Sequence, residues 1–462
     1  MNYGRRTFIK GVAGIGVTAT VTGPASAADG DVQYIVRTNG NGTRDAVVDA
    51  GFSVRHELAE GSVLVVTGPE GAAGDLESVG GVSAANPDVT VELDEPEVDA
   101  EADDGTAPKD GAALTDLQWD KEITDAFGAH EYATGEGTRV AIVDTGIDLN
   151  HPDLGNVNEE LGRAFVVDDD VPEIGPDDSG YHGTHVAGTV GATGEAGVVG
   201  TAPDTELIPV RVFPADGGAA FGDILAGIDY AAEIGADAAN FSLGIPGVQQ
   251  PGAELNKLKA EVQTVFQSAV RRGTVITGSA GNDSGSLQGS GFTLPNSVPA
   301  AFTVSATSPA DTLSFYSNFG TSDIDIAAPG GWYETTDRTL NASAEDGEIP
   351  FPQNGVLSTW PTDEESSVGL TGYDYISGTS MAAPQVAGLA ALVRELDPDA
   401  NASQVEQAIQ KGAELANGKS DPEFGAGRIN ALNTVERLAD GKGNGNSNGK
   451  ANGKAKGNGK GK

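Results

Sequence analysis

The sequence contains no cysteine among its 462 residues. Disulfide bonds and thiolate metal sites are therefore excluded, and stability must come from packing, with bound ions as a further source. A chain of this length can bury a large core and still carry additional segments. Its 66 glycines and 38% hydrophobic content indicate a globular but loop-rich protein.

Basic residues are scarce outside the C-terminus. Six of the 27 Lys and Arg lie in residues 441–462, which hold no acid, so the rest of the chain carries 21 basic residues against 68 Asp and Glu. A surface this acidic repels nucleic acid and anionic membranes, and we expect neither as a partner. The acids are spread along the whole body, which favours adaptation to high salt, where self-repulsion is screened, over solubility alone.

Long apolar runs are also missing. Near the N-terminus, Arg5, Arg6 and Lys10 precede a weakly apolar run that is too short and too rich in glycine to span a bilayer. The run ends at Ala25-Ser26-Ala27, so residues 1–28 are predicted to be a secretory signal, and the Arg5-Arg6 pair followed by "TFIK" resembles a twin-arginine export signal. No other segment reaches transmembrane length, so we expect an exported, extracellular protein with no membrane contact after maturation.

Residues 31–93 form a small α+β pattern. "VQYIVRT" and "SVLVVTG" are typical of strands, "TRDAVVDAG" and "AAGDLESVGGV" of helices, and "VTVEL" of a closing strand. Residues 94–111 are acidic and poor in apolar side chains, which is typical of an exposed linker. A small domain joined by a cleavable linker to a large one suggests a propeptide over residues 29–111.

Strands and helices alternate through residues 112–440. The strands predicted there are 139–146, 206–213, 238–244, 273–282 and 301–307, and the clearest helices are 222–235 and 385–398. Strands that are apolar on both faces, alternating with helices, indicate a parallel sheet covered by helices, with right-handed crossovers. The predicted fold is therefore α/β with three layers, α/β/α. The Gly, Asn and Lys repeats of residues 441–462 cannot form a core and are predicted to be a disordered tail.

Two polar positions at predicted element ends could carry chemistry. Asp144 closes a strand at the carboxyl end, where the sites of α/β proteins gather, although an acid there could equally cap or pair. His182 and His185 lie three residues apart at a predicted helix start. They could bind a metal, but no HExxH pattern or cysteine accompanies them. His182 follows the loop "DDSGY", so we expect it nearer the surface and active, with His185 packed.

Ser380 and Asn282 are open to two interpretations each. In "GTSMAAPQVAG", Ser380 could cap the following helix, or its hydroxyl could act beside N–H groups that stabilise an oxyanion. Pro384 costs little if it lies in the first turn of that helix. Asn282, which ends "GSAGN", could be a turn residue or could donate its amide N–H to an oxyanion. Spacing alone does not choose between these alternatives.

Four stretches together resemble one family. "VAIVDTGIDLNHPDL", "HGTHVAGTV", "SAGN" and "GTSMAAPQVAG" resemble, in order, spacing and wording, the subtilisin-like serine proteases (subtilases, peptidase S8) over about residues 118–436. The signal, the acid surplus, the lack of cysteine and the tail are similar to the halolysins, the secreted subtilases of halophilic archaea. Residues 31–93 resemble the ferredoxin-like, inhibitor I9-like propeptide of the family.

The resemblance implies a catalytic domain over residues 112–440 that hydrolyses peptide bonds through a Ser-His-Asp triad and an acyl-enzyme. Ser380 would be the nucleophile, His182 the general base, and Asp144 the group that orients His182. Asn282 would hold the oxyanion together with the backbone N–H of Ser380. The absence of a GxSxG motif argues against an α/β-hydrolase esterase. An inactive binding protein on this scaffold, or an esterase with the same triad, are the alternatives.

The resemblance also implies how substrates bind. The edge at 217–219 would pair with an extended peptide, and small uncharged walls would accept large apolar side chains before the cut. The substrate-binding residues carried over are Gly217, Gly218, Ala219, Phe221, Ser242, Leu243, Gly244, Ser279, Ala280 and Gly281. We expect a monomer that acts on proteins and peptides, with its own propeptide as intramolecular chaperone and inhibitor.

A structural calcium ion is expected from the resemblance, and no organic cofactor. Asp153 in "HPDL" matches a calcium ligand of the family, and Thr193, Glu195 and Val198 could supply further oxygens. The loop "GATGEAGVVG", however, is one residue shorter than the familiar calcium loop. Residues 333–372 are longer than in a minimal subtilase and are predicted to be a surface insertion.

Overall fold

The structure of the chain is a computed structural model. The residues it describes are Ala25, 31–40, 42–91, Leu93, Pro96, Val98, 113–166, 175–215, 218–243, 253–288, Leu294, 296–415 and 421–445. The predicted signal peptide apart from Ala25, most of the linker, and the tail from residue 446 onward lie outside these residues. The same holds for Gly217 and Gly244.

The N-terminal unit, residues 31–87, is a four-stranded antiparallel sheet with two helices. Its elements are β1 (Val32–Thr38), α1 (Thr43–Asp49), β2 (Ser53–Leu58), β3 (Val63–Gly68), α2 (Ala73–Glu77) and β4 (Val82–Pro87). The strand order is β2-β3-β1-β4, so the chain follows the β-α-β-β-α-β order of a ferredoxin-like unit. The strands predicted at 32–38 and at "SVLVVTG" are confirmed.

The predicted closing strand "VTVEL" is wrong. The strand that pairs with β1 is β4, because Tyr34 lies opposite Pro87 and Val36 opposite Ala85. Part of the stretch predicted as a helix therefore belongs to β4. The later segment β5 (Thr90–Val91) pairs instead with β9 (Ala219–Ala220), outside the unit. The local pattern of apolar residues fits either strand, and the tertiary partner decides between them.

The large domain is built on a seven-stranded sheet in the order β13-β12-β11-β10-β6-β8-β7, with every neighbouring pair parallel. Its strands are β6 (Arg139–Asp144), β7 (Arg163–Ala164), β8 (Glu206–Arg211), β10 (Ala238–Phe241), β11 (Val275–Ser279), β12 (Phe302–Thr307) and β13 (Ile326–Pro329). The five strands predicted from the sequence are confirmed. From β6 the chain adds β8 on one side of the sheet and β10 on the other, so the strand order reverses at β6. Sites of α/β proteins form at the carboxyl ends of strands beside such a reversal.

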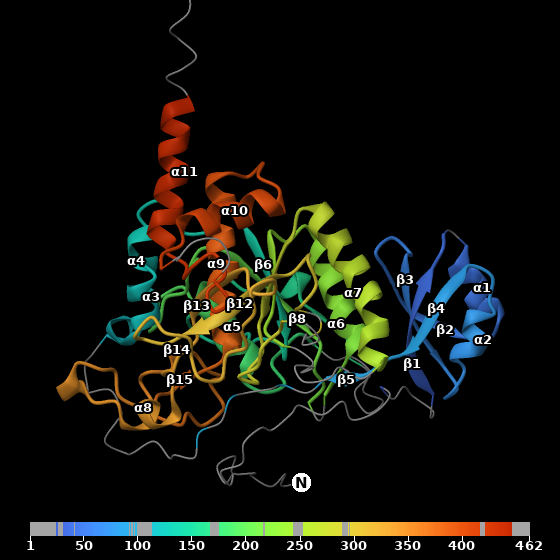
Figure 1. Cartoon of the computed structure of the whole chain (residues 1–462), viewed down its shortest axis with the longest axis horizontal. Coiled ribbons are helices and arrows are strands. Elements are labelled where there is room, and N and C mark those ends of the chain that lie inside the picture. Colours follow the sequence, from blue (N-terminus) through green and yellow to red (C-terminus); the bar gives the residue numbers. More distant parts are fainter. Residues whose placement is uncertain are drawn as a thin grey trace, which may run out of the picture.

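Alternate side chains of β6 point into two cores. Val140 and Ile142 belong to a cluster with the helices α5 (His182–Gly191) and α9 (Thr379–Leu396), whereas Ala141 and Val143 belong to a cluster with α6 (Phe221–Glu233) and α7 (Ala253–Arg272). All four side chains are buried. This alternation places helices on both faces of the sheet and gives the predicted three-layer α/β/α fold (Figure 1).

The N-terminal unit lies beside α6 and α7, on the far side of these helices from the sheet (Figure 1). The remaining helices of the large domain are α3 (Trp119–Ile123), α4 (Ala126–Ala129), α8 (Thr336–Asn341), α10 (Ala402–Gly412) and α11 (Ala431–Gly445), with short 3₁₀ helices at Leu114–Leu117, Glu159–Leu161 and Ala344–Asp346. Helix α11 continues into the predicted tail as far as Gly445. Over the described residues, no helix is both long and apolar enough to cross a membrane.

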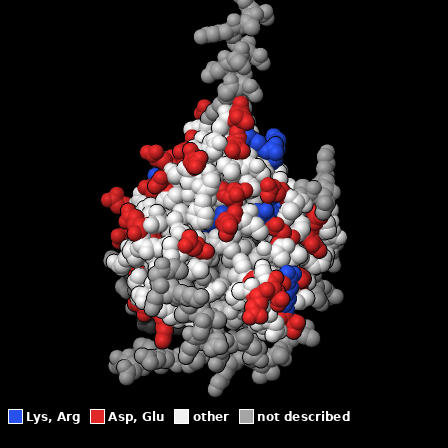
Figure 2. Space-filling model, turned by 90° about the vertical axis from the view of Figure 1, so that its left-hand side faces the viewer, with Lys and Arg blue, Asp and Glu red and all other residues white. Residues whose placement is uncertain are grey.

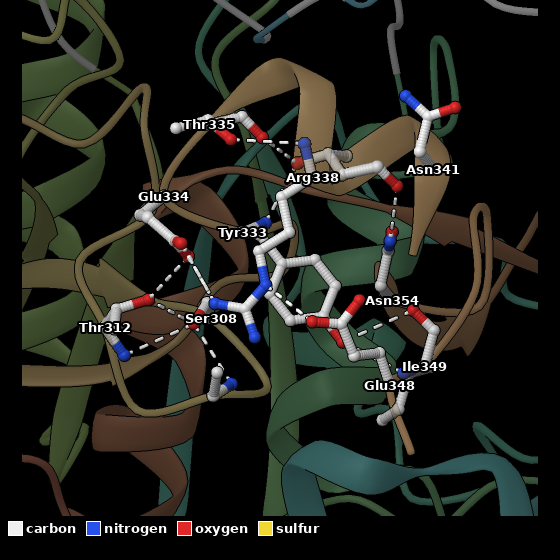
Figure 3. Close-up of polar contacts among 12 residues, drawn as sticks. Ser308, Thr312, Tyr333, Glu334, Thr335, Arg338, Asn341, Glu348, Ile349 and Asn354 are labelled. Carbon is white, nitrogen blue, oxygen red and sulfur yellow. Dashed lines mark hydrogen bonds and ion pairs between the residues drawn. The ribbon is translucent and has the colours of Figure 1, made fainter. Parts of the chain in front are cut away.

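The predicted insertion at 333–372 is partly core. Its strand β14 (Val356–Thr359) is buried, pairs with β15 (Tyr373–Ile376) and packs on α5. Residues 333–348 are held together by Arg338, whose guanidinium donates to both carboxylate oxygens of Glu334 at 2.9 Å and to Glu348 at 2.7 Å (Figure 3). This guanidinium also lies 4.5 Å from the centre of the Tyr333 ring. These charge-assisted hydrogen bonds connect residues 334, 338 and 348 in a defined geometry.

Candidate active site

Asp144 and His182 meet at the carboxyl end of β6. The Asp144 Oδ1 atom lies 2.8 Å from His182 Nδ1 and also accepts a hydrogen bond from the backbone N–H of Thr145. Both side chains are almost fully buried, with residue exposures of 0% for Asp144 and 1% for His182. The expected difference in depth between the two histidines is slight, because His185 is 0% exposed and His182 only 1%. A buried carboxylate at Nδ1 orients the ring so that Nε2 can accept a proton.

His185 is a packed helix residue. Its Nε2 atom lies 3.1 Å from the carbonyl oxygen of Val356 and 3.3 Å from that of Asp374. Since two carbonyls can only accept, Nε2 carries the proton there. Burial lowers the pKa of His185 to about 3, and the neighbouring His182 adds to this. Within the part of the chain that the structure describes, no group of three His, Cys, Asp or Glu side chains could hold a metal ion, so the structure gives no support to a metal pair of His185 with His182.

Ser380 is the second residue of α9 and is 6% exposed. Its hydroxyl donates to the carbonyl oxygen of Ser242 at 3.1 Å. Because α9 begins at Thr379, Pro384 lies in the second turn, not the first as expected, and it cannot donate to the carbonyl of Ser380. The hydroxyl of Ser242 makes that bond instead, at 2.8 Å.

A buried polar chain beneath Ser380 holds Ser242 in place. Asn240 in β10 donates from Nδ2 to the Ser242 hydroxyl at 2.9 Å and accepts from the Thr277 hydroxyl at 3.0 Å. All of these residues are buried. The sequence analysis gave Asn240 no role. The signal that could have found it is a lone amide inside the apolar strand "AANF", since a buried polar group needs partners.

Asn282 is oriented by the residue before Ser380. Its Oδ1 atom accepts from the backbone N–H of Thr379 at 3.0 Å and from the Thr379 hydroxyl at 2.9 Å. The amide nitrogen is therefore on the opposite side, where it lies 3.7 Å from the position a Cβ would take on Gly378. A donor that is fixed beside the N-terminus of α9 has the placement that an oxyanion site requires.

The predicted substrate edge is paired with the chain's own segment. Ala219 lies opposite Val91 and Ala220 opposite Thr90 in an antiparallel pair. A Cβ on Gly218 would lie only 2.4 Å from the carbonyl oxygen of Val91, so glycine allows this close approach. Gly217, the other predicted edge residue, lies outside the described residues.

The other predicted pocket residues are buried around this edge. Phe221 and Leu243 belong to the same apolar cluster as Val89 and Val91. Ser279 is the last residue of β11, Ala280 follows it, and the N–H of Gly281 donates to the Thr379 hydroxyl at 3.1 Å. The structure thus brings Ser242 and Gly281 to Ser380 and Thr379, and places Gly218, Ala219 and Phe221 around Val91. Gly244 lies outside the described residues.

The expected calcium site does not fit the surroundings of Asp153. Its carboxylate oxygens accept from the backbone N–H of Ala196 at 2.6 Å, from that of Val198 at 2.9 Å and from the Tyr373 hydroxyl at 2.8 Å. A calcium ion needs six to eight oxygen ligands, whereas this loop turns N–H donors toward the carboxylate. Over the described residues, no three His, Cys, Asp or Glu side chains are placed to hold a metal ion.

The remaining members of the expected ligand set do not change this. The backbone N–H of Thr193 donates to the carbonyl oxygen of Asp153, and Glu195 lies at the exposed tip of the loop. Gln118 closes the loop by bonding both the N–H and the carbonyl of Val199 at 2.9 Å. These hydrogen bonds hold the loop in this geometry.

Comparison with known proteins identifies the family of the chain. The profile of the subtilase family, peptidase S8, matches residues 135–427, which include Asp144, His182, Asn282 and Ser380. This chain belongs to the subtilase family. Thermitase of Thermoactinomyces vulgaris is 33% identical over 69% of this chain and 96% of its own length, and subtilisin BL of Lederbergia lenta is 33% identical over 68% and 97%. The protein is therefore a serine-type endopeptidase of the subtilisin type.

Solved structures agree on the fold of this subtilase. The epidermin leader peptide processing serine protease of Staphylococcus aureus superimposes with a TM-score of 0.70 at 22% identity, covering 88% of this chain and 98% of its own. Fervidolysin of Fervidobacterium pennivorans superimposes with a TM-score of 0.64 at 23% identity, covering 89% of this chain and 62% of its own. At these identities the likeness concerns the fold.

Proposed function

We propose that this subtilase is a secreted, salt-adapted endopeptidase made as a self-processing zymogen, with Asp144, His182 and Ser380 as its triad. The observation that carries the triad is the 2.8 Å contact of Asp144 with His182 Nδ1, at the strand end that faces the start of α9. Asp144 holds the ring and stabilises its protonated form. His182 takes the proton of Ser380 and returns it to the leaving amine.

The nucleophile has to change partners before it attacks. In this structure the Ser380 hydroxyl donates to Ser242, so it must leave that carbonyl to pass its proton to His182. The oxyanion that then forms on the substrate is held by the amide of Asn282 and by the backbone N–H of Ser380. This chemistry requires no organic cofactor, because the chain supplies nucleophile, base and oxyanion donors.

The contacts of residues 88–98 support a zymogen. Thr90 and Val91 occupy the edge β9, where an extended substrate would pair, and Pro96 Cδ lies 3.6 Å from the position a Cβ would take on Gly378. Val98 packs against the core cluster that contains α9. The described residues of the segment after the N-terminal unit thus contact both the substrate edge and Gly378, two residues before Ser380, as a bound peptide would.

Ion pairs support docking of the N-terminal unit as an inhibitor. Arg55 of β2 lies 3.0 Å from Asp223 Oδ2, and His56 Nε2 lies 3.3 Å from Asp223 Oδ1, in the first turn of α6. The backbone N–H of Ala59 donates to Asp229, also on α6. The Arg55–Asp223 ion pair and the hydrogen bond from Ala59 thus link the unit to the catalytic domain.

Secretion and salt adaptation rest on the sequence and on the surface. One relative, 32% identical over 68% of this chain and 53% of its own length, is named an extracellular protease of Xanthomonas campestris. Figure 2 shows acidic side chains spread over one face of the molecule, with few basic ones between them. We expect activity to collapse in dilute buffer and to recover in molar KCl or NaCl. Undiminished activity at low ionic strength would contradict the salt adaptation alone.

The protease proposal is tested by casein clearing. The wild-type protein should clear casein and release its N-terminal unit, whereas the Ser380→Ala variant should remain full-length and inactive. N-terminal sequencing of the secreted form locates both cleavage events. A Ser380→Ala variant that still clears casein would remove Ser380 from the mechanism.

A further inference from the structure

Asp178 lies in the loop before α5 and has no part in the mechanism described so far. Its Oδ1 atom accepts from the backbone N–H of Gly180 at 2.9 Å, and its Oδ2 atom from that of Thr184 at 3.0 Å. The hydroxyls of Thr184 and Thr145 also hydrogen-bond this carboxylate. One partly buried carboxylate therefore gathers donors from three separate positions of the chain.

Two of these donors, Thr145 and Thr184, lie close in the sequence to the proposed triad residues Asp144 and His182. Thr145 follows Asp144 directly, donates its N–H to Asp144 Oδ1, and accepts from the N–H of Gly183 at 2.8 Å. Gly183 in turn follows His182. The carboxylate of Asp178 thus connects the residue after Asp144 with the residues after His182.

The two segments that Asp178 joins, one after Asp144 and one after His182, are in direct backbone contact. A Cβ on Gly183 would lie 2.1 Å from the carbonyl oxygen of Gly146, so no side chain separates the two backbones there. The hydroxyl of Thr184 also accepts from the N–H of Asp148 at 2.8 Å. A shift of Thr145 or Thr184 would therefore change how Asp144 faces His182, and small displacements of triad groups cost rate.

Asp178 also caps α5. Tyr181, the residue at the helix start, makes no side-chain capping bond, and Asp178 satisfies the N–H of Thr184 in its place. A carboxylate at a helix N-terminus is favourable by itself. If Asp178 only caps the helix, its removal should lower stability but leave kcat per active site unchanged. If Asp178 positions the triad, its removal should lower kcat itself.

We propose that Asp178 is a positioning residue of the triad, whose carboxylate holds Thr145 and Thr184 and through them fixes Asp144 against His182. The inference rests on the proposed triad. Its charge has a second effect, because a carboxylate beside the Asp144–His182 pair favours the protonated imidazole. The other charged or titratable groups around the pair are Asp148, Asp177, His185 and one cation, Arg211, which lies opposite Asp144 on β8 and donates to the backbone carbonyls of Asp177 and Phe213. Burial, with Asp144 adding to it, raises the pKa of Asp178.

The test is the pH dependence of kcat and KM of the secreted enzyme on a peptide amide, with active sites counted by titration so that unfolded protein does not contribute. For Asp178→Asn we expect kcat to fall about tenfold or more with KM within twofold, and the acid limb of kcat/KM to move to lower pH. Asp177→Asn is the matched control, because solvent screens the charge of this exposed side chain and, among the described residues, its carboxylate accepts only from the N–H of Leu149, at 3.5 Å. That control should keep the wild-type profile.

Wild-type kcat and an unmoved acid limb in Asp178→Asn would overturn the proposal. The same holds if its loss of activity disappears once active sites are counted. If Asp178→Asn does not fold, Thr184→Val serves instead, since it removes one bond to the carboxylate and keeps the charge. It should lower kcat and leave the acid limb in place, and wild-type kcat would overturn the proposal. An active Ser380→Ala would instead refute the triad, so the two failures are distinguishable.

Discussion

The hydroxyl of Ser242 donates to the backbone carbonyl of Ser380 at 2.8 Å, the carbonyl that Pro384 leaves without its helical partner. This contact joins the end of β10 to the start of α9 at the nucleophile. A hydrogen bond from the residue after β10 thus replaces the hydrogen bond that residue 384 would donate within the helix. The position of Ser380 is thereby set by two elements that are 138 residues apart in the chain.

Removing the hydroxyl of Ser242 tests this contact. The Ser242→Ala variant leaves a buried carbonyl unpaired, which costs about 1–3 kcal/mol of stability, and it should also lower kcat. Thermal unfolding, measured in the Ser380→Ala background to prevent self-digestion, gives the first quantity. The double variant Ser242→Ala/Pro384→Ala should regain stability, because alanine restores the helical N–H donor. If adding Pro384→Ala has no effect, this account of the contact is wrong.

Asn282 should contribute to the transition state and little to ground-state binding. In a member of this family, loss of one oxyanion donor lowers kcat by about 10²–10³-fold, and we expect the same for Asn282→Ala with little change in KM. Asn282→Asp keeps an oxygen that can accept from Thr379 but loses the amide donor. It should be equally impaired in kcat. Near-normal turnover by this aspartate variant would assign Asn282 a structural role only.

Docking of the N-terminal unit should weaken as pH rises. Burial raises the pKa of Asp88 to about 7, the nearby Asp223 adds to this, and the N–H of Gly222 opposes it. The docked state therefore holds a proton that the released state gives up at about pH 4. The stabilisation of the docked state by Asp88 is complete below about pH 4 and is lost as the pH rises to about 7. Between these values the docking equilibrium constant falls by up to tenfold per pH unit.

Limited proteolysis of the full-length Ser380→Ala protein across pH 4–8 measures this release. Cleavage of the linker by an added protease should become faster as pH rises, up to about pH 7. Asp88→Asn cannot ionise, so its cleavage rate should be flat over the same range. A wild-type rate that is constant with pH, or an unchanged slope in Asp88→Asn, would remove Asp88 from the switch.

Chelation separates the expected calcium ion from the hydrogen bonds observed at Asp153. Because N–H donors of Ala196 and Val198 occupy that carboxylate, any change in Tm caused by EDTA should be the same in the wild-type and Asp153→Asn backgrounds, both carrying Ser380→Ala. Asp153→Asn by itself should lower Tm, since an amide cannot accept from all three donors. An EDTA effect that vanishes in Asp153→Asn would place the ion at this residue.

Local patterns in the sequence predicted the strands of the sheet and the motifs that meet at its edge. Strand β6 could be predicted because it is apolar on both faces, and its last residue, Asp144, lies where α/β sites form. The closing strand of the N-terminal unit was wrong, because pairing with β1 or with β9 depends on tertiary contacts. The predicted helix 385–398 begins later than α9, because a proline such as Pro384 is unfavourable inside a helix. In the structure Ser242 donates to the carbonyl of Ser380, which Pro384 leaves without a helical donor.

Residues that act through distant partners could not be read from the sequence. Asp178 is one acid among many, and its partners Thr145 and Thr184 become neighbours only in the folded chain. His182 was expected nearer the surface than His185 from the polar loop before it, whereas both are buried, His182 in contact with Asp144. Pattern indicates which residue types are available, and packing decides which of them meet.

The central claim, that Ser380 is a nucleophile activated by His182 and Asp144, is tested most directly with a fluorophosphonate probe on the secreted enzyme, followed by peptide mapping. We predict one covalent adduct on Ser380, absent in Ser380→Ala, strongly slowed in His182→Ala, and absent after heat denaturation of the wild type. An adduct on another residue, or an active enzyme that the probe does not label, would contradict the account.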